Sequence, residues 1–213
     1  SIETWADENG FQFSKTKTVC MHFSDVNSVH ADPDLQLYGE SIPVVAETKF
    51  LGLILDKKLT FIPHIKYLKD QCLKALKILR VVAHKDWGAD CATLLKLYRS
   101  HVRSKLDYGC VVYGSARQSA LDCLDCLDRV QNAALRVCLG AFRTSPIASL
   151  HVEAGELPLT LRRQQLSLQY IIKLRSTPSN PAFRCVFNSN FKLLFEARQQ
   201  ITPTLGLRLH QDI

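Results

Sequence analysis

Hydrophobic and polar positions follow two patterns along the chain, and the change falls near residue 62. Within residues 1–62 the pattern shifts every few positions, which is typical of short elements joined by turns. The first segments predict a helix over 1–8, which Asn9-Gly10 ends, and an alternating strand over 18–23. A hairpin follows, in which residues 35–38 and 42–45 flank the turn at 39–41. The last segments predict a buried strand over 49–55 and a solvated turn at Asp56-Lys57-Lys58. Thr60 is a plausible N-cap for the helix that follows.

From Pro63 onward the apolar positions recur with a helical period. Helices are predicted over 63–84, 89–106, 119–139, 146–154 and 158–175, with a buried turn and short helix between 106 and 113. The first helix has one apolar stripe, formed by Ile65, Leu68, Cys72, Leu76 and Leu79. Residues 177–181 are expected to be a linker, and residues 182–213 are patterned so weakly that we expect poor order. The fold class is therefore α+β: a small antiparallel part in 1–62, a helical bundle in 63–176 and a linker or tail in 177–213.

Charge separates the same two regions. Residues 1–62 contain 5 Lys and Arg against 9 Asp and Glu, whereas residues 63–213 contain 22 against 11. A basic second region favours contact with a polyanion, although a solvated basic surface is the alternative. No apolar run reaches the roughly 20 residues that a membrane-spanning helix needs. The start Ser1-Ile2-Glu3 lacks a signal peptide and a Met, from which we expect a fragment of a longer reading frame.

The eight cysteines favour reduced thiols over a metal site. Only Cys123 and Cys126 have metal-like spacing, and they lie inside a helical pattern without a second Cys or His pair nearby. We therefore expect no metal ligands in this chain and an intracellular location, with nucleus or cytoplasm left open.

Two phrases near the start of the chain are the most specific signal. One runs from Trp5 to Phe23; the other is Lys49-Phe50-Leu51-Gly52-Leu53-Ile54-Leu55-Asp56 followed by Leu59-Thr60-Phe61-Ile62-Pro63-His64-Ile65. They resemble palm motifs of reverse transcriptases from non-LTR retrotransposons, the LINE-like and in particular the jockey-type elements. Later phrases resemble segments that follow the palm in these elements: Tyr108-Gly109-Cys110-Val111-Val112-Tyr113-Gly114, then 127–136, then Glu153-Ala154-Gly155-Glu156-Leu157-Pro158-Leu159.

The resemblance implies a function for each region. Residues 1–62 correspond to the C-terminal edge of the palm, where Phe50, Leu51 and Gly52 match the primer grip that lies against the 3′ end of the growing strand. Lys17 best matches a Lys near the departing pyrophosphate, and Lys15 is the runner-up. Such a Lys neutralises charge or donates a proton to the leaving group. A surface lysine at a strand start is the alternative for Lys17, and core packing is the alternative for the grip residues.

The helices after Pro63 correspond to the thumb, which holds the duplex of RNA template and DNA primer. Two basic rows support this match from the residues themselves. Lys66, Lys69, Lys77 and Arg80 fall within about 80° of one another on the first helix, opposite its apolar stripe, and Lys96, Arg99 and Arg103 repeat along the second. Rows of this kind can follow a phosphate backbone without reading sequence, although solvated amphipathic helices look the same.

The catalytic metal ligands of the family are missing from this chain. A polymerase palm holds two Mg²⁺ ions with paired aspartates, and the 213 residues contain no Asp-Asp dipeptide. The remaining carboxylates, Asp7-Glu8 and the i, i+3, i+6 set Asp122, Asp125 and Asp128, are more typical of solvated acidic faces. We therefore expect a fragment of an RNA-directed DNA polymerase that is inactive alone and needs the upstream part of the enzyme. The alternatives are a domesticated or degenerate relic that only binds nucleic acid or protein, and an all-α interaction module that retains the palm segment passively.

Overall fold

The computed structural model describes residues 2–23, 32–114 and 118–187, and the backbone alone at 118–122. The chain divides into two compact units, Ser1–Pro63 and His64–Ile213. In its described residues the first contains one helix and two antiparallel hairpins, and the second is helical, so the α+β class is confirmed. In the part that the structure describes, none of the helices is both long and apolar enough to cross a membrane.

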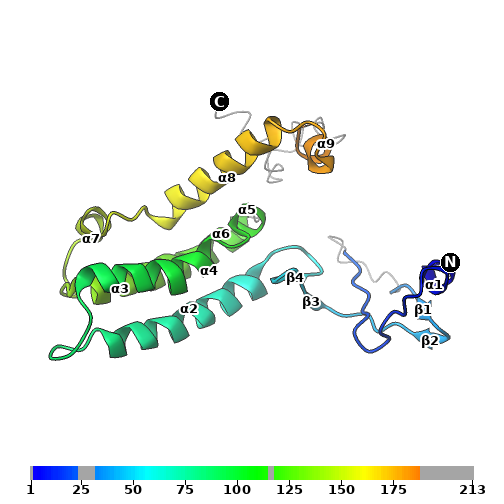
Figure 1. The fold of residues 1–213 in the computed structure, drawn as a ribbon, viewed down its shortest axis with the longest axis horizontal. Helices are drawn as coiled ribbons and strands as arrows, with labels where there is room; N and C mark the ends of the chain where they lie inside the picture. Colours follow the sequence, from blue (N-terminus) through cyan, green and yellow to red (C-terminus); the bar gives the residue numbers. More distant parts are fainter. Residues whose placement is uncertain (1, 24–31, 115–117, 188–213) are drawn as a thin grey trace. The chain divides into compact units, whose positions relative to one another are not determined.

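The first unit opens with α1 (Ile2–Glu8), which ends as predicted at a left-handed glycine, Gly10, with φ of 70°. The predicted hairpin is present but tighter: β1 (Gln36–Leu37) pairs with β2 (Glu40–Ser41) around Tyr38-Gly39 (Figure 1). Both turn residues have positive φ, 51° and 76°, as a two-residue hairpin turn of type I′ requires. Gly39 adopts this positive φ without strain and therefore permits the two-residue turn.

Two strand predictions in this unit are wrong. The apolar run 49–55 is not one buried strand; it forms a hairpin of β3 (Glu47–Phe50) and β4 (Leu53–Asp56). The chain reverses at Leu51-Gly52, where φ is 45° and 86°, since glycine permits this turn in the middle of an apolar run. The strand predicted over 18–23 is reduced to an isolated bridge between Cys20 and Val44.

The turn before the long helix is also different from the prediction. Asp56 is not solvated: its carboxylate is buried and accepts hydrogen bonds from the backbone N–H groups of Thr60 (3.1 Å) and Phe61 (2.8 Å). The Thr60 hydroxyl donates to the same carboxylate at 3.0 Å and accepts from the N–H of Ile62 at 3.3 Å, in keeping with the predicted cap. These bonds stabilise a tight turn in which Leu59 and Phe61 both adopt positive φ.

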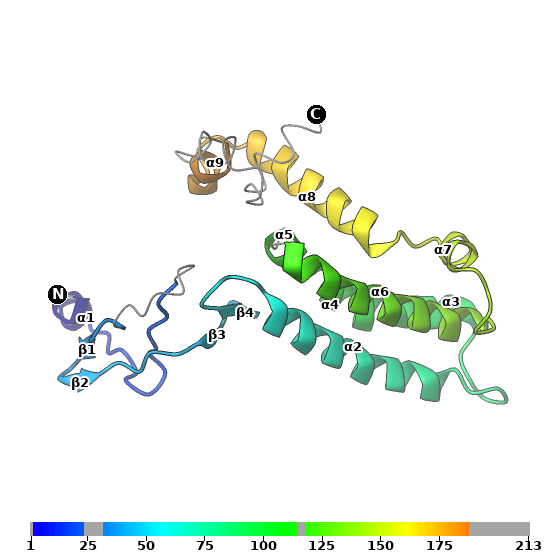
Figure 2. The ribbon, with the colours of Figure 1, turned by 180° about the vertical axis from the view of Figure 1, so that it is seen from behind.

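The second unit contains the helices that the periodicity predicts, within a few residues at their ends (Figures 1 and 2). They are α2 (Ile62–Val82), α3 (Cys91–Tyr98), the π-helical η1 (Arg99–Arg103), α4 (Ser104–Asp107), α5 (Cys110–Tyr113), α6 (Gln118–Leu139), α7 (Ile147–Ala154) and α8 (Leu159–Arg175). A last helix, α9 (Pro181–Phe187), lies where a poorly ordered tail was predicted, and the rest of that tail lies outside the described residues.

The core of this unit is assembled from helices far apart in sequence. All five members of the predicted α2 stripe are buried. α3 and α7 pack on α6, and α8 packs on α4 and α5. The ring of the buried His64, at the start of α2, lies 5.2 Å from the ring of Tyr113 in α5. The tyrosine of the Val-Tyr-Gly phrase is thus a packing residue.

Three of the cysteines are protected by this core. Burial raises the pKa of Cys72, Cys110 and Cys138 to about 11, whereas Cys91 and Cys185 are exposed. At pH 8 a thiol with that pKa is about one-thousandth ionised, so it is a poor nucleophile even when reached. We expect a thiol reagent to modify Cys91 and Cys185 within minutes and the three buried thiols only on unfolding. Mass mapping of timed samples measures this, and fast labelling of Cys138 in the folded chain would contradict the packing of α6 on α3.

Candidate nucleic-acid interface

The exposed face of α2 is the clearest cationic surface of the second unit. Lys66, Lys77 and Arg80 are exposed and Lys69 is half-buried, on a face that flanks the buried stripe. Among the described residues, none of these four side chains has an ion-pair or hydrogen-bond partner. Lys74, outside the predicted row, is also exposed on this helix, and so is one carboxylate, Asp70. The face therefore carries an excess of positive charge, as phosphate contacts require.

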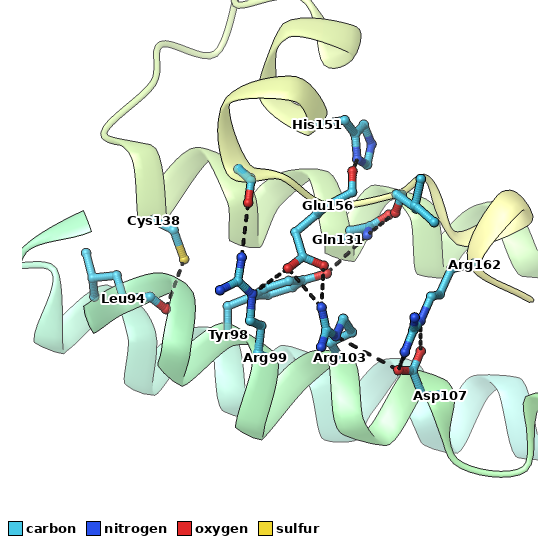
Figure 3. A network of polar contacts seen from close by, with 12 residues as sticks. Leu94, Tyr98, Arg99, Arg103, Asp107, Gln131, Cys138, His151, Glu156 and Arg162 are labelled. Carbon is cyan, nitrogen blue, oxygen red and sulfur yellow. Dashed lines mark hydrogen bonds and ion pairs between the residues drawn. The ribbon is translucent and has the colours of Figure 1, made fainter. Parts of the chain in front are cut away.

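The second basic row has a different environment. Lys96 is exposed, but Arg99 and Arg103 point at one buried carboxylate, that of Glu156 (Figure 3). Its side chain is 3% exposed, and it accepts from Arg99 Nε at 2.6 Å and from Arg103 Nη1 at 3.0 Å. Arg99 also donates to the carbonyl of Ala154 at 3.2 Å. The phosphate contacts assigned to Arg99 and Arg103 stay a prediction, and their charge is partly neutralised within the fold.

Glu156 is the centre of a network that joins three parts of the unit. Arg103 also lies 3.9 Å from Asp107, and Asp107 accepts a bidentate contact from Arg162 of α8, with a shortest distance of 2.8 Å. This hydrogen bond raises the pKa of the Arg162 guanidinium. The carboxylates of Glu156 and Asp107 thereby connect η1 and α4 to the segment from α7 to α8.

A neutral branch of the same network lies in the core. Gln131 of α6 is 1% exposed and donates to the Tyr98 hydroxyl at 3.1 Å and to the Leu157 carbonyl at 3.0 Å. Burial raises the pKa of that hydroxyl, so it stays protonated. His151 Nδ1 lies 3.0 Å from the Glu156 carbonyl. Gln131 and Glu156 both stand in the later phrases of the resemblance, and the sequence by itself did not indicate their polar contacts.

The predicted primer grip lies at the tip of the β3–β4 hairpin. Phe50 is 61% exposed and Leu51 is 75% exposed, although the sequence predicted a buried run. Gly52 follows with positive φ, so the turn presents two apolar side chains and a stretch of backbone without a Cβ. Such a tip has the shape and chemistry to lie against another molecule, and the grip assignment stays a prediction.

The two candidate lysines of the palm motif differ in what holds them. Lys15 forms an ion pair with Glu40 at 2.7 Å and lies 3.4 Å from the Tyr38 carbonyl, so it is tied to the β1–β2 hairpin. Lys17 is exposed at the end of a turn closed by its own N–H to Ser14 O, at 3.2 Å. Among the described residues its ammonium group has no partner. The geometry therefore favours Lys17 over Lys15 as the lysine available to a ligand.

Among the described residues, the carboxylates are not arranged to hold a pair of catalytic Mg²⁺ ions. Asp7 and Glu8 are exposed at the end of α1, and nowhere in the described residues do three His, Cys, Asp or Glu side chains gather as metal ligands. Of the acidic set on α6, Asp125 is exposed, Asp128 is half-buried and the side chain of Asp122 lies outside the described residues. No step of nucleotide transfer is therefore assigned to residues of this chain through a metal.

Asp128 offers a test of the packing around α6. Burial raises the pKa of its carboxyl, so the charged form costs stability and this cost appears as the pH rises through the folded-state pKa. We expect Asp128→Asn to be more stable than the parent at pH 7, with the difference vanishing below about pH 3.9, where the carboxyl is protonated in both states. Urea titrations of both proteins at pH 7 and below about pH 3.9 measure the difference in the free energy of unfolding. Asp125→Asn, exposed on the same helix, is the control and should change little; a loss of stability in Asp128→Asn at pH 7 would contradict the burial.

Comparison of the sequence with curated proteins finds several relatives. A Pol polyprotein from the type-1 retrotransposable element R1 of Bradysia coprophila is 29% identical over 175 residues, which cover 82% of this chain and 17% of the polyprotein. A putative 115 kDa protein in element R1DM of Drosophila melanogaster is 28% identical over 173 residues, covering 81% of this chain and 17% of that protein. The RNA-directed DNA polymerase from the D. melanogaster mobile element jockey is 28% identical over 123 residues, with 57% and 13% covered. The chain is a homologue of non-LTR retrotransposon polyproteins.

The resemblance to non-LTR, jockey-type retrotransposons is thus confirmed. The chain spans 17% of the length of each of the two R1 proteins named above. No family model matches the chain, and no solved structure matches it. Several phrases that mark the relationship now have a physical explanation: Tyr113, Gln131 and Glu156 are buried and form the packing and polar contacts described above.

Proposed function

We propose that this chain is the part of a non-LTR retrotransposon reverse transcriptase that holds the duplex of RNA template and DNA primer. The observation that supports this most is the α2 face, where Lys66, Lys69, Lys77 and Arg80 have no partner among the described residues. Unpaired cations on a rigid helix release counterions from a phosphate backbone on binding, which gives affinity without sequence preference. The named activity of the jockey relative supplies the ligand class.

Within this proposal residues 1–62 act as the edge of the palm and residues 63–176 as the thumb. The exposed tip formed by Phe50, Leu51 and Gly52 positions the 3′ end of the primer. Lys17 acts on the side of the departing pyrophosphate. The buried network around Glu156 keeps the thumb helices in place without contacting the ligand.

Salt dependence of duplex binding tests the proposal. The triple variant Lys66→Gln, Lys69→Gln, Lys77→Gln should flatten the slope of log K against log salt by about 2–3, since each phosphate contact contributes roughly 0.9 on duplex. Fluorescence anisotropy with a labelled RNA–DNA hybrid at several salt concentrations measures the slope.

The control removes the same charge elsewhere. Lys173, Arg175 and Arg184 are exposed on α8 and α9, away from α2 in sequence, so their change to Gln should leave the slope nearly intact. Equal slopes for both triple variants would mean that net charge, and not the α2 face, controls binding.

A second candidate function is a nucleic-acid-binding module that takes no part in synthesis. It is favoured by the same basic face together with the absence of an Asp-Asp dipeptide from the 213 residues. We expect the chain alone to show no primer extension with Mg²⁺ or Mn²⁺. Addition of the aspartate-bearing polymerase segment of the same reading frame should restore synthesis if the chain is a polymerase part; continued inactivity beside intact duplex binding would favour the module.

A further inference from the structure

A hollow of about 330 Å³ lies between the C-terminal ends of α2 and α6. It is lined by Arg80, Ala83, Arg136, Val137, Gly140 and Ala141. Each helix thus contributes one guanidinium group to the same small space, and no carboxylate lines it. Its volume is at the lower end of the roughly 300–1,000 Å³ of small-ligand sites, which suits a single phosphate or nucleotide.

The two arginines of the hollow are not neutralised by the fold. Arg80 is exposed and has no ion-pair partner among the described residues. Arg136 donates to the Ser145 carbonyl only at a long 3.5 Å, and its buried Nε has no hydrogen-bond partner in the part of the chain that the structure describes. Neither guanidinium therefore has a carboxylate partner among the described residues, and an anion in the hollow would supply the missing negative charge.

An exposed aromatic residue follows each of the two chain segments that line the hollow. Immediately after Ala83, the ring of His84 stacks on that of Trp87 at 5.0 Å and 14°, while Trp87 stays 64% exposed. Immediately after Ala141, Phe142 is 82% exposed. Exposed rings beside cationic groups are the combination with which proteins bind unpaired strands, because every base has a face that can stack.

The local charge favours the same ligand. Lys85 and Arg143 are exposed in the two loops that follow the hollow's walls, and Asp86 and Asp90 are the acidic residues of these loops. With Arg80 and Arg136, this end of the unit therefore has four cationic side chains against two carboxylates, a net positive charge that favours an anionic polymer over a basic or apolar partner.

We propose that the hollow between α2 and α6 binds a backbone phosphate of an unpaired nucleic-acid strand whose neighbouring bases stack on Trp87 and Phe142. Paired bases inside a duplex cannot stack on these rings. This site therefore binds an unpaired strand, whereas the α2 face binds a duplex. The inference rests on the proposed function only for its ligand class, a nucleic acid. The site binds the single-stranded part of a template next to the duplex held by the rest of α2.

Trp87 provides a direct readout of binding. The chain contains two tryptophans, so Trp5→Leu leaves Trp87 as the single indole. In this background, a titration with oligo-dT should quench the indole emission by half or more, because stacking on a base quenches tryptophan. Blunt DNA duplex should quench it little.

Variants then separate the two sites in the 213-residue chain. Trp87→Leu, Phe142→Leu and Arg136→Gln should each weaken binding of a labelled single-stranded oligonucleotide at least fivefold and change affinity for blunt duplex less than twofold. The triple α2 variant should show the opposite preference. Arg175→Gln and Trp5→Leu are the matched controls, and thermal melts verify that Arg136→Gln is folded; Trp87 and Phe142 are exposed, so their variants are free of that concern.

Each outcome distinguishes the two proposals. Loss of single-strand affinity in Trp87→Leu, in a chain that does not bind duplex, would overturn the proposed function and leave this inference standing. Unchanged single-strand affinity in all three variants, or an equal loss for both ligands, would overturn the inference even if duplex binds as expected. Quenching of Trp87 by a protein segment of the same polyprotein but not by oligo-dT would also overturn it.

Discussion

In the complete polymerase, Lys17→Leu is expected to slow nucleotide incorporation about 100-fold while leaving affinity for primer and template nearly unchanged. A positioned proton donor contributes roughly 10²-fold or more, which corresponds to about 2.7 kcal/mol of transition-state stabilisation. The interaction exists mainly in the transition state, so the loss appears in the rate and not in binding. The structure is compatible with this role, because the Lys17 ammonium is exposed and has no partner among the described residues. Single-turnover kinetics with a defined primer–template measure the rate.

Lys15→Leu is the matched control, two residues away in the same turn. Lys15 is engaged with Glu40 at 2.7 Å, so its loss should loosen the β1–β2 hairpin and change the incorporation rate only slightly. Partly exposed ion pairs of this kind contribute at most about 1 kcal/mol. A slower rate for Lys15→Leu than for Lys17→Leu would reverse the assignment, and equal parental rates for both would remove the motif from catalysis.

The second large effect concerns stability: Glu156→Gln is expected to lower the free energy of unfolding by about 2–3 kcal/mol. Removing one partner of a buried ion pair costs roughly 3–5 kcal/mol when the other charge stays buried, and the cost is smaller here because water reaches Arg99 and Arg103. Their side chains are 40% and 30% exposed, whereas that of Glu156 is 3% exposed. Urea denaturation followed by circular dichroism measures the change.

Glu153→Gln is the control, because Glu153 is exposed in the same short helix, α7. It should change stability by less than about 0.5 kcal/mol. A double-mutant cycle with Arg103→Met adds a sharper test. If the two residues interact, the double variant loses less free energy of unfolding than the sum of the losses in the two single variants. Additive losses would show that the Glu156–Arg103 contact is energetically unimportant.

The helical half of this protein was predictable because each helix has its own local signals. The α2 stripe, from Ile65 to Leu79, is buried as its spacing predicted. Gly140 and Gly155 end α6 and α7 with positive φ, as helix-terminating glycines do. An apolar face every 3.6 residues is enough to define a long helix before its packing partner is known.

The strand half was less predictable because a short apolar run does not say where it reverses. Residues 49–55 read as one strand, and positive φ at Leu51 and Gly52 makes them a hairpin. The same difficulty applies to Asp56, which is polar in sequence but is buried by the turn that it stabilises. Hydrophobicity predicts burial only when the direction of the backbone is known.

What the sequence alone determined is the relationship to non-LTR retrotransposons, the helical periodicity and the basic character of residues 63–213. What the tertiary structure decided is which charges are available. Lys66 and Arg103 look alike in sequence, yet Lys66 is exposed without a partner among the described residues, while Arg103 faces Glu156, 53 residues away. The physical reason is that an ion pair depends on distance in space, and a carboxylate brought in from the loop between α7 and α8 neutralises a cation that its own helix leaves exposed.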